Sequence, residues 1–188
     1  VDPVHYLMRK ESVSSVALME RALEAERAGD HDRAETLYRE ALVLLADAER
    51  VNPLRPQTSY IRGMLYQQNP DLAGVRWAEF AAESYRQTLR IDPRALWARM
   101  SYAQLLLAQG RLADARAVLD EGIGYWYIPE PQAFAYYSLT AQLRRRSGDH
   151  TGAAALLQKL DHLQRAARVR TDPFGSQPKP IQPEPKKP

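Results

Sequence analysis

Apolar residues recur at helical spacing through most of this chain of 188 residues, and short turns rich in glycine, proline or aspartate interrupt them. The first apolar segment runs from Val13 to Ala28 and ends at Gly29, a residue type that readily ends a helix. Ser12 precedes this segment and is of a type that caps helix N-termini. Continued along the chain, the pattern predicts four helical hairpins, at about 12–53, 57–93, 95–128 and 131–170.

The two ends of the chain lie outside this pattern. Residues 1–11 form a short N-terminal lead whose order the pattern does not predict. Residues 171–188 contain six prolines and almost no large apolar group, so they cannot pack a core and are predicted to form a flexible tail. Within this tail, the spacing of Pro180 and Pro183 fits either a plain spacer or a PxxP-type recognition peptide.

A second pattern marks the returning helix of each predicted hairpin, where an alanine is followed four residues later by a bulky residue. In three of the four cases a glycine stands five residues before the alanine. A small residue lets the two helices of a hairpin approach closely, and the bulky residue one turn later fills the space against the next hairpin. The pairs are Ala34 and Tyr38, Ala81 and Tyr85, Ala115 and Leu119, and Ala153 and Leu157.

The spacing of these alanines is unequal, at 47, 34 and 38 residues. The extra residues of the first interval lengthen the helix that ends near Val51 and the loop Asn69–Gly74. Those of the last interval fall in the connector Tyr125–Pro131. These irregular places are where we expect a partner-specific feature.

Together these features resemble the tetratricopeptide repeat, a unit with the consensus W-x2-L-G-x2-Y, then A-x3-F, then P. Gly63 and Tyr66 match the first part, the four alanine pairs match the second, and Pro53 and Pro93 match the closing proline. The resemblance implies an all-α fold, a right-handed α-solenoid of about four hairpins with a long C-terminal helix. It also implies that the chain binds other proteins.

In this family the first helix of each hairpin lines a concave groove, which assigns a set of candidate partner-binding residues by their place in the repeat. Methionine and aromatic residues at helical spacing are also ordinary core residues, so both interpretations remain open for this set. The candidates are Met19, Leu23, Tyr60, Met64, Trp97, Met100, Gln104, Gln142 and Arg145, with Val16 and Ser138 beside them.

The candidate groove lacks the lysines and asparagines with which some members of the family clamp a C-terminal carboxylate. A protein or peptide partner with apolar anchors fits it better. The aromatic connector is a second candidate, either as a plug between two hairpins or as an exposed contact patch of Tyr125, Trp126 and Tyr127.

Charge and composition exclude several other functions. The net charge is only +3, because 26 cations face 23 anions, so nucleic acid is not predicted as a partner. The chain has no cysteine, and no apolar run is long enough to span a membrane. His31 and His150 each follow a Gly-Asp turn, which marks a repeated structural motif rather than a ligand pair. We therefore predict no catalytic residue, no metal site and no cofactor.

The predicted function is a scaffold or adaptor in the assembly of a bacterial envelope complex, such as a secretion, pilus or polysaccharide-export system. The arginine-rich, cysteine-free composition is the basis of this context, which implies a periplasmic or envelope-associated location, with a cytoplasmic one as the alternative. A second hypothesis is a soluble regulatory domain of a larger membrane enzyme, such as an O-antigen ligase or polymerase. A regulator that acts with nucleic acid fits the balanced charge least.

Overall fold

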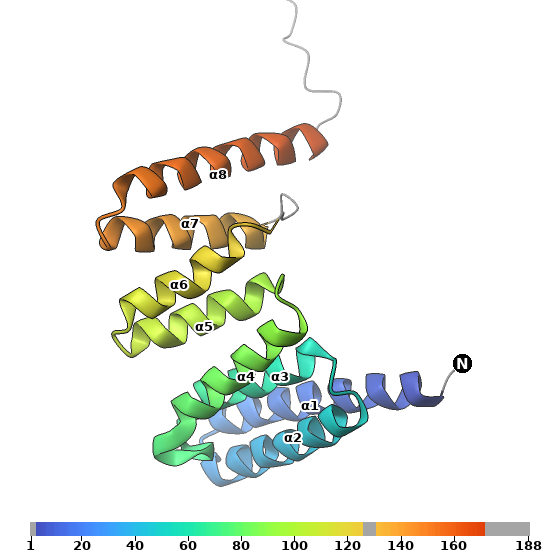
Figure 1. Cartoon of the computed structure of the whole chain (residues 1–188). Coiled ribbons are helices and arrows are strands. Elements are labelled where there is room, and N and C mark those ends of the chain that lie inside the picture. Colours follow the sequence, from blue (N-terminus) through green and yellow to red (C-terminus); the bar gives the residue numbers. More distant parts are fainter. Residues whose placement is uncertain (1–2, 126–130, 172–188) are drawn as a thin grey trace, which may run out of the picture. The chain divides into compact units, whose positions relative to one another are not determined.

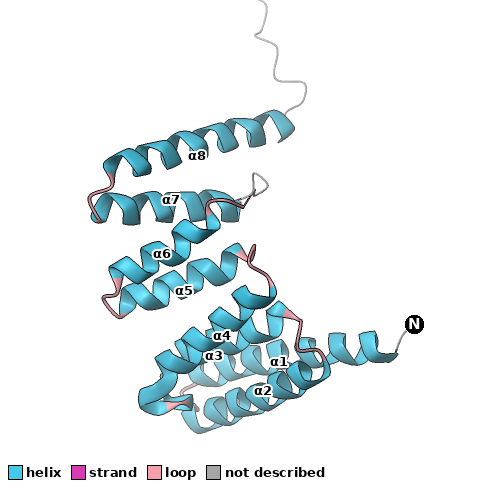
Figure 2. Ribbon diagram, viewed as in Figure 1, coloured by secondary structure: helices cyan, strands magenta, loops and turns pink. Residues whose placement is uncertain are grey.

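The computed structural model describes residues 3–125 and 131–171, and every regular element in these ranges is a helix. The chain divides into two units, Val1–Tyr125 and Trp126–Pro188. The described part of the first unit contains six α-helices and that of the second contains two (Figures 1 and 2). They are α1 (Pro3–Arg27), α2 (His31–Val51), α3 (Pro56–Gln68), α4 (Trp77–Ile91), α5 (Leu96–Ala108), α6 (Leu112–Gly122), α7 (Pro131–Arg146) and α8 (His150–Thr171).

These helices form the four predicted hairpins, because α1 packs on α2, α3 on α4, α5 on α6, and α7 on α8. In the first unit, α2 also contacts α3 and α4 contacts α5, so successive hairpins stack (Figure 1). One boundary prediction is wrong: α1 begins at Pro3, and Ser12 lies inside the helix instead of capping it. Proline is tolerated at the first helical position, and no helix-breaking residue stands between Pro3 and Ser12 to stop the helix.

Three of the four hairpin turns have the same geometry. Gly29, Gly110 and Gly148 adopt φ values of 80°, 75° and 84°, in the left-handed region that favours glycine. The N–H group of the next residue donates to the carbonyl five residues before it, over 2.9, 2.9 and 2.8 Å. This pattern is the Schellman motif, which satisfies carbonyls at the end of a helix.

In the first and last hairpins the residue after this glycine also caps the next helix. The carboxylate of Asp30 accepts a hydrogen bond from the backbone N–H of Arg33 at 3.2 Å. That of Asp149 accepts one from the backbone N–H of Gly152 at 2.8 Å. The Gly-Asp pair therefore ends one helix and starts the next, which explains why it occurs at equivalent places in two hairpins.

The four repeat alanines are all buried, as the pattern predicts: Ala34, Ala81, Ala115 and Ala153. Three of their bulky partners are buried too, but Leu157 is 42% exposed, and the neighbouring Leu156 is the buried residue of that turn. Because α8 is the last helix in the described residues, no following hairpin covers Leu157 there.

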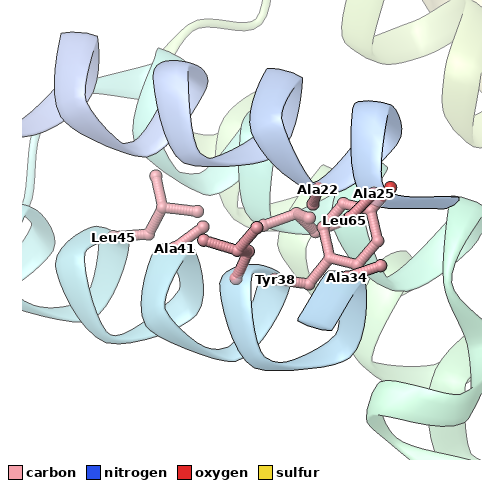
Figure 3. Close-up of a cluster of buried hydrophobic side chains, with 8 residues drawn as sticks. Ala22, Ala25, Ala34, Tyr38, Ala41, Leu45 and Leu65 are labelled. Atoms are coloured by element: carbon pink, nitrogen blue, oxygen red, sulfur yellow. The ribbon is translucent and has the colours of Figure 1, made fainter. Parts of the chain in front are cut away.

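The core of the first hairpin shows how these small residues work (Figure 3). Ala22 of α1 and Ala34 of α2 lie in one buried cluster with the ring of Tyr38, which the figure places between the two helices. Leu65 of α3 joins the same cluster from the second hairpin. This shared core stacks the first two hairpins against each other.

The second hairpin departs from the others because its turn is longer. The alanine spacing predicts additional residues in this loop. Two short 3-10 turns occupy it, η1 (Pro70–Leu72) and η2 (Gly74–Arg76). Before this loop, Gly63 of α3 approaches the ring of Tyr85 on α4. A Cβ atom at Gly63 would lie only 2.7 Å from the ring, so the close approach of α3 and α4 requires glycine there.

Hairpins in the first unit are joined by a repeated Asx-Pro turn. α2 ends at Asn52-Pro53 and α4 at Asp92-Pro93, as predicted. The Oδ1 atom of Asn52 accepts a hydrogen bond from the N–H of Leu54 at 3.2 Å, and that of Asp92 accepts one from Arg94 at 3.0 Å. Each Asx side chain thus orders the turn into the next hairpin.

Candidate functional site

Helices α3 and α5, the first helices of the second and third hairpins, carry almost no charge. Each contains one charged residue, Arg62 and Arg99 respectively, in a chain that is 26% charged. Arg62 forms an ion pair with Glu49 of α2 and donates to the hydroxyl of Ser84 at 3.1 Å. Arg99 is buried. Both cations are therefore engaged in packing, and the remaining side chains of the two helices are neutral.

Aromatic rings connect these two helices through α4. Tyr60 of α3 meets Trp97 of α5 edge-on, with ring centroids 4.3 Å apart and an interplanar angle of 70°. Tyr85 of α4 lies 5.9 Å from Tyr60 and 6.3 Å from Tyr102 of α5, centroid to centroid. Such contacts add to the stability that apolar burial provides. We call these four packed rings the aromatic wall: Tyr60, Tyr85, Trp97 and Tyr102.

Beside this wall is a hollow of about 120 Å³, which we call the neutral pocket. No charged side chain lines it. Its lining residues come from α3, α4 and α5: Tyr60, Met64, Gln67, Gln68, Tyr85, Ser101 and Gln104.

The hydroxyl groups at the neutral pocket are held by neighbours. Tyr85 donates to the Oε1 atom of Gln67 at 2.6 Å, and the hydroxyls of Tyr60 and Ser101 lie 3.3 Å apart. Burial, with the nearby Tyr60 in second place, raises the pKa of Tyr85 well above its ordinary value. The phenol is therefore a neutral hydrogen-bond donor at physiological pH.

Two side-chain amides at the neutral pocket are uncommitted. Gln68, the last residue of α3, and Gln104 of α5 are both exposed. Neither makes a hydrogen bond within the part of the chain that the structure describes. Each offers a carbonyl oxygen and an NH₂ group to a bound molecule.

The structure brings part of the predicted groove together. Tyr60, Met64 and Gln104 line the neutral pocket, and Trp97 packs against Tyr60. Met64 also packs on the buried cluster of Ala81, Tyr85 and Leu105, so it is at once a core residue and a lining residue. The other candidates lie outside the pocket: Met19 packs on the core of the first hairpin, Leu23 is exposed on α1, Met100 is half-buried on α5, and Gln142 and Arg145 are exposed on α7 in the second unit.

Sequence comparisons agree with the hairpin geometry. Two family models, each described as tetratricopeptide repeat, match residues 78–125 and 103–167. Residues 78–167 of this chain belong to the tetratricopeptide-repeat family. The fold class predicted from the alanine pairs is thereby confirmed. No curated protein matches the sequence.

Solved structures of other tetratricopeptide-repeat proteins share this fold. PilF of Pseudomonas aeruginosa matches with a TM-score of 0.55 and 18% identity, over 83% of this chain and 64% of PilF. PilW, a type IV pilus biogenesis factor, matches with 0.50 and 24%, over 80% and 62%. A double mutant of MamA RS-1 matches with 0.52 and 16%, over 87% and 84%. The chain thus spans less than two thirds of PilF and PilW, and at these identities the likeness concerns the fold alone.

The repeat register explains which pocket residues sequence reasoning missed. Gln67 and Gln68 follow Tyr60 and Met64 at helical spacing, so the same face of α3 contains them. Ser101 stands one turn before Gln104 on α5. The family consensus does not mark these polar positions, whereas Tyr85 was marked only as a core residue.

The irregular loop of the second hairpin builds a second hollow, of about 240 Å³, at the turn between α1 and α2. Glu26, Glu35 and Asp71 are among its lining residues. Burial, together with the Glu26 carboxylate, raises the pKa of Tyr38 there to about 12. Glu35 is already paired with Arg39 at 2.6 Å.

The aromatic connector is described only in part. Tyr125 is half-buried, and the Arg99 guanidinium lies over its ring, 5.6 Å from the centroid. Tyr125 therefore packs within the first unit. Trp126 and Tyr127, the other members of the predicted contact patch, lie outside the described residues.

Two further features of the described residues bear on function. They contain no group of three or more His, Cys, Asp or Glu side chains placed to hold a metal ion. Among them, no helix combines the length and the apolar character needed to cross a membrane.

The hydrogen bond from Tyr85 to Gln67, two residues that line the neutral pocket, can be tested by itself. Tyr85→Phe should lower the free energy of unfolding by about 1 kcal/mol, because it removes one buried hydrogen bond and leaves Gln67 without its donor. Urea unfolding monitored by circular dichroism measures this. Tyr66→Phe is the matched control, because the Tyr66 hydroxyl has no hydrogen bond in the described residues. Equal losses in the two variants would contradict the role of the bond.

Proposed function

We propose that this chain is a non-catalytic scaffold that holds a segment of a partner protein against α3 and α5. The proposal rests on the surface of α3 and α5 around the neutral pocket, which we call the neutral face. In a chain that is 26% charged, these two helices carry half-buried aromatic rings and methionine and exposed amides around a pocket without a charged lining residue. Cores of protein–protein interfaces are depleted in charge and enriched in Tyr, Trp and Met, which is the composition found here.

Exposed apolar side chains outside the neutral pocket are further candidates for partner contact. Val16 and Leu23 of α1 are 40% and 41% exposed, although both are large and apolar. Met19 lies between them in sequence, and Met100 lies on α5. We propose that these residues add to the partner contact on the first unit. On the second unit, taken by itself, we propose that Gln142 and Arg145 of α7 offer polar contacts.

The proposed setting is the assembly of a bacterial envelope complex, of the pilus, secretion or polysaccharide-export type. PilW is described as a type IV pilus biogenesis factor, and its likeness to this chain in fold supports the pilus type among these. A regulatory domain of a larger membrane enzyme is the alternative. The coding sequence around this segment separates them, since a lipoprotein signal supports the scaffold and a series of membrane helices supports the enzyme-linked domain.

The proposal predicts that partner capture depends on the aromatic wall. The double variant Tyr60→Ala, Trp97→Ala should reduce the amount of captured partner at least about tenfold, because interface hot spots are enriched in these ring types. Affinity capture from the native host, followed by quantitative mass spectrometry, measures this. A photo-crosslinking amino acid at Gln104 identifies which captured protein touches the pocket.

Val43→Ala is the matched control, because Val43 is a 62% exposed apolar residue on α2, away from the neutral pocket. It should leave capture unchanged. Circular dichroism must show that the double variant keeps its helical content. If a correctly folded double variant captures as much crosslinked partner as the wild type, the neutral face is not the binding surface.

A further inference from the structure

The polar groups of the neutral pocket determine which side chain it can hold. Six of its seven lining residues carry a hydroxyl or an amide, and only Met64 does not. The volume of about 120 Å³ equals about four water molecules at about 30 Å³ each, which is room for one side chain. The hydrogen-bonding groups that the lining residues leave free therefore decide the chemistry of that side chain.

The three hydroxyl groups of the neutral pocket are already used. Tyr85 gives its single hydrogen to the Oε1 atom of Gln67, so Ser101, which also bonds to Tyr85, is the donor of that second bond. The hydroxyls of Tyr60 and Ser101 lie 3.3 Å apart. Because Ser101 has then used its own hydrogen, Tyr60 is the donor to it. None of these three hydroxyls has a hydrogen left for a bound molecule.

Three glutamines supply the remaining groups. The bond from Tyr85 occupies the carbonyl oxygen of Gln67 and leaves its NH₂ group as a donor. Gln68 and Gln104 are exposed and make no hydrogen bond within the part of the chain that the structure describes. Each of them offers both an NH₂ group and a carbonyl oxygen. The neutral pocket thus presents donors and acceptors together, without a charged lining residue.

We propose that the neutral pocket recognises a carboxamide, the side chain of an asparagine or glutamine of the partner protein, through the amides of Gln67, Gln68 and Gln104. This inference rests on the proposed function, since it names the side chain that the partner presents to α3 and α5. The carbonyl oxygen of a carboxamide accepts from an NH₂ group of the pocket, and its own NH₂ group donates to the carbonyl oxygen of Gln68 or Gln104.

Other classes of side chain leave part of the neutral pocket unsatisfied. A carboxylate only accepts hydrogen bonds, so it brings no donor to the carbonyl oxygens of Gln68 and Gln104, and it meets no opposite charge. A lysine or arginine only donates, so it brings no acceptor to the NH₂ group of Gln67, and it meets no carboxylate. An aliphatic side chain displaces water from the amides without replacing their hydrogen bonds, which weakens its binding.

The test compares three probes that differ only in their side chain: N-acetyl-glutamine methylamide, N-acetyl-glutamate methylamide and N-acetyl-methionine methylamide. Because all three carry the same peptide groups, a difference in affinity reports the side chain alone. Each is titrated into protein labelled with ¹³C at the methionine methyl groups. Met64 lines the pocket, whereas Met19 packs on the core of the first hairpin.

The glutamine probe should shift the Met64 methyl signal and leave that of Met19 unmoved. It should bind at least about fivefold more tightly than either of the other probes, because only its side chain both donates and accepts. The double variant Gln68→Ala, Gln104→Ala should reduce this preference to less than about twofold. Gln57→Ala is the matched control and should keep it, because Gln57 is an exposed glutamine of α3 that does not line the pocket.

Equal binding of the glutamine and methionine probes overturns the carboxamide, and tighter binding of the glutamate probe overturns the choice of an uncharged side chain. A preference that persists in the double variant overturns the role of Gln68 and Gln104. A Met64 signal that moves with none of the probes overturns the site itself.

Each of these failures leaves partner capture and its dependence on Tyr60 and Trp97 intact, so the proposed function survives them. Conversely, capture that persists in the Tyr60, Trp97 double variant removes the proposed function even if the glutamine probe binds.

Discussion

Arg99→Ala should lower the free energy of unfolding by about 4 kcal/mol, because it removes a buried cation that joins the turn before α5 to α6. The side chain is 4% exposed. Its guanidinium donates to the carbonyl of Pro93 at 3.1 and 3.0 Å and to the carbonyl of Val118 at 2.8 Å. One arginine thus joins the turn before α5 to the last turns of α6, and its loss leaves those carbonyls without this donor.

Thermal unfolding monitored by circular dichroism measures this effect, which corresponds to a fall in Tm of roughly 10 °C for a chain of this size. Arg94→Ala is the matched control, since Arg94 is exposed and lies only five residues away. It should cost less than about 0.5 kcal/mol. Arg99→Lys should be intermediate, because an ammonium lacks the planar fork that reaches both carbonyls. Equal stability of the Arg99→Ala and Arg94→Ala variants would show that the hydrogen bonds from Arg99 to Pro93 and Val118 do not stabilise the fold.

The hairpins could be predicted from sequence because their ends depend on local chemistry. Gly29, Gly110 and Gly148 supply a backbone conformation that other residues resist, and the Asx-Pro turns end α2 and α4. The repeat alanines were predictable for a similar reason, since only a small residue fits where two helices approach closely. The limit of this reasoning is visible at Leu157, which matches the pattern but is 42% exposed, since no further helix within the described residues follows α8.

The candidate site was predictable only in part, because a pocket is a property of several helices at once. Tyr60, Met64 and Gln104 were found from the repeat register, which carries the face of each helix. Gln68 was missed because an exposed polar residue at a helix end has no sequence signature. Arg99 was missed because hydropathy places arginine at the surface, and only the tertiary fold supplies the carbonyls that let it be buried.

Gly63→Val should lower the free energy of unfolding by about 3 kcal/mol, and Gly63→Ala by about 1 kcal/mol, because both add atoms where α3 meets α4. The new Cβ atom would lie 2.7 and 2.9 Å from the Tyr85 ring and 3.2 Å from the Cβ atom of Ser84. The ring cannot move aside easily, since it is buried and bonded to Gln67. Alanine is the milder change because its better helix propensity offsets part of the clash.

Because Tyr85 also lines the neutral pocket, the same substitutions connect stability to binding. A ring displaced by the new side chain changes the neutral pocket, so both variants should reduce partner capture as well as the free energy of unfolding. Gly124→Ala is the control, because a Cβ atom there meets nothing within 4 Å, and it should leave unfolding and partner capture unchanged. If Gly63→Val destabilised the fold without altering partner capture, Tyr85 would be a core residue only, and the binding surface would begin at Tyr60 and Met64.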